Sequence, residues 1–159
     1  MKNLRTHAVC VCISLMSLSS FAQTNSKPPI NEPDYNKPRL FDNLPERIPV
    51  NINNISSLFN SAIGVEVGKG ISENPSTFRI EGQVIANSLT NNDKQQNVVI
   101  RSTNYNGAGF TISKTIDADG AVTYNGRLIN LKYGDLYLLE KDKEGYTLVK
   151  KNFYDLINE

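Results

Sequence analysis

Residues 78–88 read FRIEGQVIANS, a stretch in which apolar and polar side chains alternate along the chain. Every second position from Phe78 to Ala86 is apolar or glycine, and the polar side chains of Arg79, Glu81 and Gln83 fall between them. Successive side chains of a β-strand point to opposite faces, so this pattern buries one face and leaves the other in solvent. The stretch therefore predicts a half-buried strand of an antiparallel sheet.

Similar β-prone runs lie on both sides of this strand and are separated by turn residues. All ten glycines occur from Gly64 onward, whereas Pro75 is the only proline in that part of the sequence. The other runs are residues 64–68, 97–104, 109–116, 121–131, 135–141 and 146–150. Short runs punctuated in this way are typical of a strand meander. We expect about six to seven strands, in a curled sheet or a partly open barrel.

A different pattern precedes the meander and indicates a helix. Five apolar residues recur at the spacing of one helical face: Ile55, Leu58, Phe59, Ala62 and Ile63. Asn53 or Asn54 can cap the first turn, and Gly64 suits the left-handed position past the end. Residues 152–157 (NFYDLI) predict a second, short helix at the C-terminus. The expected fold class is therefore α+β.

The segment before the helix has an unusual composition. Six of the seven prolines lie between Pro28 and Pro49, in a segment without glycine. Such composition indicates an extended leader, covering residues 23–50. The leader is either a flexible linker or a segment that docks onto the domain through its larger apolar side chains, which are Tyr35, Leu40, Phe41 and Leu44. Residues 51–159 then form a single β-rich domain.

The first 22 residues have the features of an export signal. Lys2 and Arg5 precede an uncharged apolar run over residues 8–18, which is too short to span a bilayer. Small residues at Ser20 and Ala22 place the cleavage between Ala22 and Gln23. The Phe-Ala-Gln ending resembles exported proteins of Bacteroidota-type bacteria, which implies Sec-type export to the periplasm or the medium. We expect no membrane span in the mature chain.

Removal of the signal changes the available chemistry. Both cysteines, both methionines and the only histidine, His7, lie within residues 1–22. The mature chain therefore has no disulfide, no thiol nucleophile and no imidazole for a catalytic triad or a zinc site. We expect no catalytic residues, no metal and no cofactor. Carboxylate chemistry, lysine or tyrosine chemistry and calcium binding remain open.

Charge excludes one class of partner. Loss of Lys2 and Arg5 leaves 15 basic side chains against 16 acidic ones, from 17 and 16 in the whole sequence. Proteins that bind nucleic acid through its phosphates carry a clustered basic surface, and the runs around Lys141 and Lys150 are too sparse for one. Nucleic acid is not expected as a partner. The oligomeric state stays undetermined by the sequence.

Two groups of acidic residues are candidate sites. Asp117, Asp119 and Gly120 resemble the start of a calcium loop, but the later ligand positions are not acidic, so a hairpin turn is the preferred interpretation. The second group could supply a carboxylate pair for glycoside hydrolysis, yet each member lies beside a lysine or at a strand end, which favours solvated edge charges. This group comprises Asp135, Glu140, Asp142 and Glu144.

Tyrosines are the remaining candidates for a binding surface. Aromatic rings with a polar tip are common at binding sites, and equally common in the cores of β-sheets. Four tyrosines on or beside the predicted strands are the candidate binding residues: Tyr105, Tyr124, Tyr133 and Tyr137. Core packing is the alternative for each of them.

The order of features from Phe78 to Leu148 resembles the β-rich N-terminal propeptide of reprolysin-type secreted metallopeptidases. The matching residues are FRIEGQV at 78–84, GFTIS at 109–113, Asp119-Gly120, GRLI at 126–129 and YLLE at 137–140. The resemblance implies a sheet that covers a protease or helps it fold, and no catalysis by this segment. The sequence departs from the family because it has no His-Glu-x-x-His segment and no mature cysteine to occupy a zinc ion.

These observations favour an exported, non-catalytic domain that binds another exported protein through a sheet face or edge. Two alternatives remain open. One is a small-molecule or glycan-binding module that uses exposed tyrosines, and the other is a structural envelope protein of unknown role.

Overall fold

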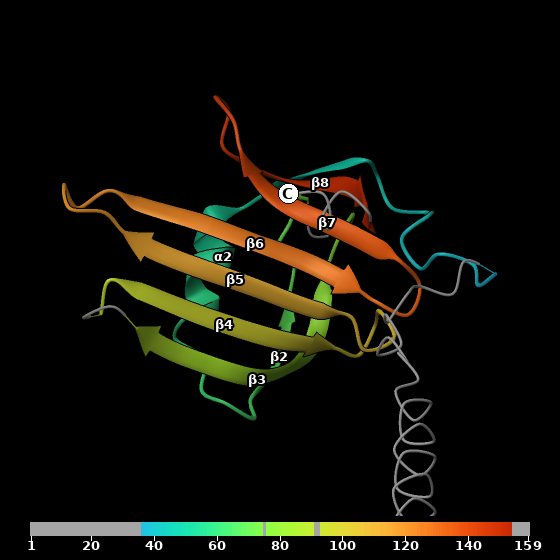
Figure 1. The fold of residues 1–159 in the computed structure, drawn as a ribbon, viewed down its shortest axis with the longest axis horizontal. Coiled ribbons are helices and arrows are strands. Elements are labelled where there is room, and N and C mark those ends of the chain that lie inside the picture. Colours follow the sequence, from blue (N-terminus) through green and yellow to red (C-terminus); the bar gives the residue numbers. More distant parts are fainter. Residues whose placement is uncertain (1–35, 75, 91–92, 154–159) are drawn as a thin grey trace, which may run out of the picture. The chain divides into compact units, whose positions relative to one another are not determined.

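The computed structural model describes residues 36–74, 76–90 and 93–153. Within these ranges the chain forms one eight-stranded antiparallel sheet and one short helix (Figure 1). The elements are β1 (Arg47–Val50), α2 (Ile52–Leu58), β2 (Glu66–Lys69), β3 (Ile80–Thr90), β4 (Gln95–Ser102), β5 (Gly109–Ile116), β6 (Val122–Asn130), β7 (Asp135–Lys141) and β8 (Tyr146–Asn152). The predicted signal peptide and its cleavage site at Ala22 and Gln23 lie outside the described residues.

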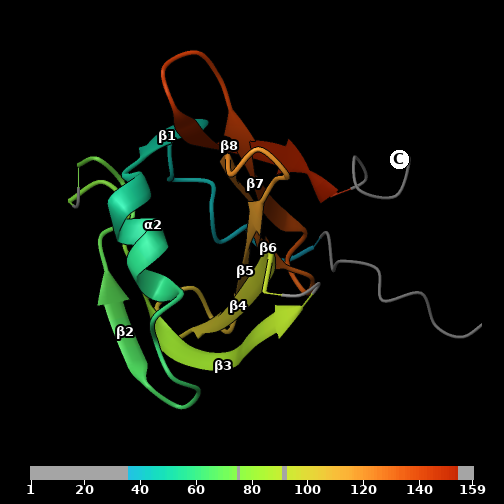
Figure 2. The ribbon, with the colours of Figure 1, turned by 90° about the vertical axis from the view of Figure 1, so that its left-hand side faces the viewer.

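The strand order is β1-β8-β7-β6-β5-β4-β3-β2. Strands β2 to β8 follow one another as a meander, as predicted, and β1 pairs with the last strand, where Arg47 lies opposite Val149. The sheet is open but strongly curled, and α2 runs from the end of β1 toward the start of β2 (Figure 2). Residues just after β2 meet β1 through a bridge between Val50 and Ser72.

The predicted α+β class is wrong. The described chain is mostly sheet, with eight strands instead of six to seven, and its first element is a strand rather than the helix. The additional strand is β1, which lies in the proline-rich segment expected to be an extended leader. The sequence did not predict β1 because the strand contains Pro49, and proline is unfavourable inside a sheet and is confined to its edges. The predicted C-terminal helix begins at Asn152, which belongs to β8, and residues 154–159 lie outside the described ranges.

Helix α2 forms where the apolar spacing predicted a helix, but it has only seven residues. Asn51, rather than Asn53 or Asn54, is the N-cap, and its side chain accepts hydrogen bonds from the backbone N–H groups of both. Ile55 and Leu58 are buried against the sheet. The helix ends before Ala62 and Ile63, so these two residues do not join its buried face.

Two glycines allow neighbouring strands to approach closely. A Cβ atom at Gly82 of β3 would collide with the carbonyl group of Arg101 on β4, and one at Gly126 of β6 would lie 2.9 Å from the Thr111 carbonyl oxygen of β5. A position without a side chain lets a strand bend at such a point. Figure 2 shows that β3 is sharply curved.

The second half of the predicted leader docks onto the sheet. Phe41 and Ile48 are fully buried, and Leu40 and Leu44 pack against the core. Tyr35, the fourth apolar residue expected to dock, lies outside the described ranges. The hydrophobic core therefore includes residues that precede position 51, and burial of Phe41 adds an aromatic side chain whose removal typically costs about 3–5 kcal/mol.

Candidate functional site

Strand β3 continues beyond the end of its neighbour β2. Glu66, the first residue of β2, pairs with Gln83 of β3. Beyond this pair, the Val84 N–H donates to the Val65 carbonyl oxygen (3.0 Å), and the Val84 carbonyl oxygen accepts the Gly64 N–H (2.8 Å). From Ala86 to Thr90, β3 pairs with β4 alone among the described residues, and Ile85 is the extra residue of a bulge. Figure 1 shows this part of β3 along the lower margin of the sheet. We call residues 85–90 the β3 edge.

The β3 edge has a bulge at its start, at Ile85, but lacks two other usual protections of an edge strand. Its sequence, IANSLT, contains no charged residue and no proline, the two features that normally prevent a second chain from pairing with an exposed edge. Within the described ranges, six large apolar side chains are exposed, and four of them belong to this corner of the sheet. They are Ile63 (63% exposed), Val65 (47%), Ile85 (40%) and Leu89 (58%).

The end of α2 explains why these side chains are exposed. The Asn87 side chain donates hydrogen bonds to the carbonyl oxygens of Phe59 (3.0 Å) and Ser61 (2.8 Å), and the Gln96 side chain donates to the same Phe59 oxygen (2.8 Å). These bonds satisfy carbonyl groups that a longer helix would have used. The helix therefore stops, and the chain turns outward with Ile63 and Val65 beside β3.

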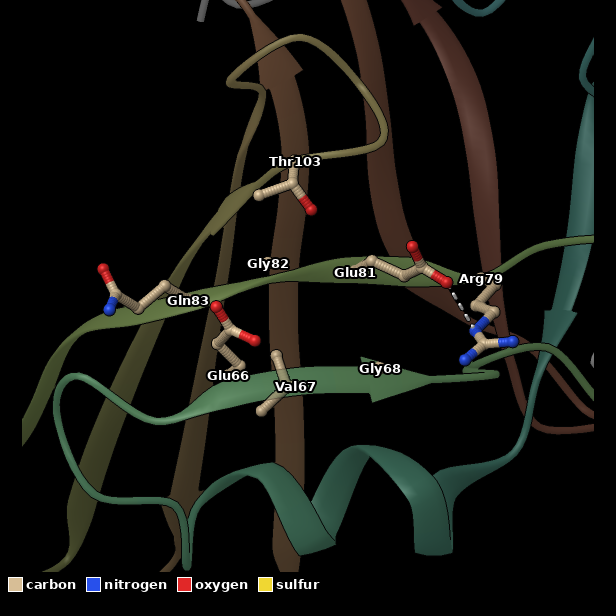
Figure 3. Close-up of a pocket in the computed structure, with 8 residues that line it drawn as sticks. All are labelled: Glu66, Val67, Gly68, Arg79, Glu81, Gly82, Gln83 and Thr103. Carbon is tan, nitrogen blue, oxygen red and sulfur yellow. Dashed lines mark ion pairs between the residues drawn. The ribbon is translucent and has the colours of Figure 1, made fainter.

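A polar hollow of about 260 Å³ adjoins this corner, across β2 and the first half of β3 (Figure 3). Its polar lining comes from Glu66 on β2, Arg79, Glu81 and Gln83 on or before β3, and Thr103 after β4. Val67, Gly68 and Gly82 complete the lining.

The described residues that line the polar hollow include two acidic side chains, Glu66 and Glu81, and one basic side chain, Arg79. Arg79 forms an ion pair with Glu81, with 3.1 Å between Nε and Oε1, and so neutralises one of the two carboxylates. Among the described side chains, Glu66 has no ion-pair partner within 4 Å. Figure 3 shows the Glu66 carboxylate directed toward β3. The polar hollow therefore carries a net negative charge.

A second hollow, of about 480 Å³, lies between the docked leader and β8. Both of its lysines form ion pairs: Lys150 with Glu46 (3.1 Å), and Lys151 with Glu140 of β7 (2.8 Å). Lys150 also donates to the Leu44 carbonyl oxygen (2.9 Å). These contacts fasten the leader to the sheet and indicate a structural role for the hollow.

Two of the four candidate tyrosines lie together in an aromatic cluster. Tyr105 stacks on Phe78 and meets Phe41 edge to face, with ring centroids 5.6 Å apart in both pairs. Tyr137 is fully buried beside Phe41, and its hydroxyl donates to the Pro45 carbonyl oxygen at 2.6 Å. Burial raises the pKa of both tyrosines.

The other two candidate tyrosines lie elsewhere. Tyr124 packs between Phe59 and Tyr146, with ring centroids at 6.0 Å and 5.7 Å, and burial raises its pKa. Tyr133 lies in the turn before β7, where its hydroxyl accepts a hydrogen bond from the Asn106 side chain (2.8 Å). The four tyrosines thus occupy three separate places and do not form one shared surface.

The candidate acidic residues have structural contacts. Glu140 pairs with Lys151, and Asp142 pairs with Arg47 (3.1 Å) while also accepting the N–H groups of Glu144 and Gly145 in its turn. Asp119 accepts the Ala121 N–H (3.0 Å) in the hairpin between β5 and β6, so the turn interpretation is confirmed. In the described part of the chain, no three acidic residues are grouped to hold a metal ion.

Asp135 differs from the solvated edge charge that was expected. It is 4% exposed, and its carboxylate accepts the backbone N–H groups of Leu40 (2.8 Å) and Phe41 (3.3 Å). Desolvation raises the pKa of this carboxyl group, whereas the two hydrogen bonds and the charge of Arg39 lower it, and the net shift is upward. Asp135 therefore acts as a clamp on the leader.

Comparison of the chain with protein-family models, with curated proteins and with solved structures gave no match. The part of the chain that the structure describes has no helix long and apolar enough to cross a membrane.

Proposed function

We propose that the chain is an exported, non-catalytic binding domain, and that its β3 edge pairs with an extended segment of another exported protein. The observation that carries this proposal is the uncharged, proline-free edge from Ile85 to Thr90, which has no strand beside it in the described structure. Addition of a strand to an exposed edge is a common mode of peptide recognition, in which main-chain hydrogen bonds supply affinity.

The side chains around the edge indicate what the bound segment contains. Ile63, Val65, Ile85 and Leu89 offer apolar contacts on the two faces of the strand position beside β3. A bound strand presents alternate side chains to these two faces. The preferred segment is therefore extended, rich in β-branched residues and free of proline over about six positions.

The contacts of the polar residues support a non-catalytic role. Asp135 holds the leader, Asp142 forms a turn, and Glu140 forms a cross-strand ion pair. Tyr105 and Tyr137 belong to the core cluster. These residues were the main candidates for carboxylate or tyrosine chemistry, and each is engaged in holding the fold.

The family resemblance suggests which partner to test first. A propeptide-like sheet packs against the peptidase that it covers or helps to fold, so an exported peptidase of the same organism is the first partner that we propose. The proposal of export depends on the signal in residues 1–22. Protein sequencing of the purified mature chain tests that signal, and an N-terminus at Gln23 is expected.

A peptide probe tests the edge directly. The probe is a blocked seven-residue peptide that alternates valine and threonine, and its binding is measured by calorimetry and by hydrogen exchange of the mature protein. We expect slower amide exchange within residues 85–90 and about tenfold weaker binding to Leu89→Lys or Ile85→Lys, because a charge at an edge opposes strand addition.

The matched control is Leu131→Lys, which places the same charge on an equally exposed leucine in the turn between β6 and β7. This variant is expected to bind the probe as the parent protein does. Protection that appears elsewhere in the sheet, or equal binding to all four proteins, would show that the β3 edge is not the binding site.

A further inference from the structure

We infer that the polar hollow receives a lysine or arginine side chain of the segment bound at the β3 edge. This inference rests on the proposed function and adds the charge of the partner to it. It also assigns a role to Glu66, which has no ion pair in the described structure.

The polar hollow lies on β3 just before the β3 edge begins. Glu81 and Gln83 are alternate residues of β3, so their side chains share the outer face of the sheet. Ile85 follows them as the extra residue of the bulge between Val84 and Ala86, and its side chain is exposed as well. Glu81 and Gln83 line the polar hollow, and Ile85 begins the β3 edge. A strand that pairs with the edge at Ile85 therefore has its nearest outward side chain beside the polar hollow.

The polar hollow has a negative charge that Arg79 does not neutralise. Among the described lining residues, Arg79 is the only one with a positive side chain; it is bound to Glu81, and its Nη2 atom lies over Gly68. No ion pair of the described side chains involves the Glu66 carboxylate, which faces β3 (Figure 3). A basic side chain would neutralise it, and the long, flexible stem of lysine or arginine lets the charged group reach it.

The charge of the polar hollow affects selectivity. An uncharged edge recognises any extended apolar segment, because main-chain hydrogen bonds carry no sequence information. A charged group beside the edge discriminates between partners by attraction to one charge and repulsion of the other. The polar hollow thus gives the β3 edge a preference for a segment with a basic residue next to its apolar stretch.

The experiment compares end-substituted forms of the valine–threonine probe, in which one terminal threonine is replaced by lysine or by glutamate. Both ends are tested, so that either strand direction is covered. We expect the lysine form to bind about three to ten times more tightly than the glutamate form, as the attraction and repulsion of partly exposed charges allow. The difference should shrink in 1 M salt, because the Debye length there is about 3 Å.

Two variants connect the preference to the polar hollow. Glu66→Gln is expected to remove the difference between the lysine and glutamate probes, whereas Glu144→Gln, an exposed acid in the turn between β7 and β8, should leave it unchanged. A preference that persists in Glu66→Gln would overturn the inference. Equal binding of both probes would also overturn it while leaving the proposed function intact, and the absence of any probe binding would count against the proposed function itself.

Self-association is a separate outcome. If sedimentation shows a dimer that Leu89→Lys dissociates, the β3 edge is occupied by a second copy of the chain, and both proposals are wrong. A monomer that binds the lysine probe supports both.

Discussion

The Asp135 carboxylate accepts the backbone N–H of Leu40 at 2.8 Å, although 95 positions of sequence separate the two residues. The same carboxylate accepts the N–H of Phe41, and the Tyr137 hydroxyl binds the Pro45 carbonyl nearby. Strand β7 therefore binds the backbone of the leader at Leu40 and Phe41. The buried Phe41 side chain also anchors the leader in the core.

Replacing Asp135 separates hydrogen bonding from charge. Asp135→Ala leaves the N–H groups of Leu40 and Phe41 without an acceptor, and each buried unsatisfied group typically costs about 1–3 kcal/mol. Asp135→Asn keeps an acceptor oxygen and should be much less destabilising. Urea unfolding followed by circular dichroism measures both free energies, and equal losses for the two variants would contradict the clamp.

The pH dependence of stability should report the same carboxyl group. Its pKa is raised in the folded protein, so the folded state binds more protons than the unfolded state between the ordinary value of about 3.9 and the raised value. The stabilising contribution is complete below the ordinary value and is lost as pH rises through the raised one. The free energy of unfolding of the parent protein, measured relative to Asp135→Asn, is expected to fall with pH across this window. A flat or rising difference would contradict the shift.

Phe41 should be the most important residue of the docked leader. It is 1% exposed and contacts Tyr105 and Tyr137, so Phe41→Ala is expected to lower the free energy of unfolding by about 3–5 kcal/mol. Leu131→Ala, which removes an exposed side chain, should stay within about 0.5 kcal/mol of the parent protein. If Phe41→Ala were equally mild, the leader would not contribute to the core.

Gly82 is expected to tolerate no side chain. A Cβ atom there meets the Arg101 backbone, which cannot move without breaking the pairing of β3 with β4. Gly82→Ala should destabilise the fold by about 1–3 kcal/mol, as overpacking does elsewhere. Gly109→Ala is the control, because open space surrounds that position. Thermal unfolding of the two variants compares them directly, and similar melting temperatures would count against the close approach.

The sheet was predictable where period-2 alternation was strong. Residues 78–88 correspond to β3, and the other predicted runs correspond to β2 and to β4–β8. β1 escaped prediction because four residues with a central proline show too little alternation, and its strand partner is remote in sequence. Helix α2 was predicted too long because Asn87 and Gln96, which end it, belong to strands that follow it.

The candidate site was less accessible from sequence. Tyr137 has the same local pattern whether it faces the core or the solvent, so sequence could not decide between the two. Asp135 appeared to be a strand-end charge, because its partners Leu40 and Phe41 lie far away along the chain. One sequence signal for the β3 edge did exist: the run from Ile85 to Thr90 lacks the charges that usually protect an exposed strand.

The pairing of β1 with β8 has a consequence for how the protein is made. The first strand finds its strand partner in the last one, so the sheet cannot be completed until nearly the whole domain has been synthesised. Contacts between such distant segments give a high contact order and slow folding. For the exported protein that we propose, late completion of the sheet would keep the chain unfolded while it passes through a translocation channel.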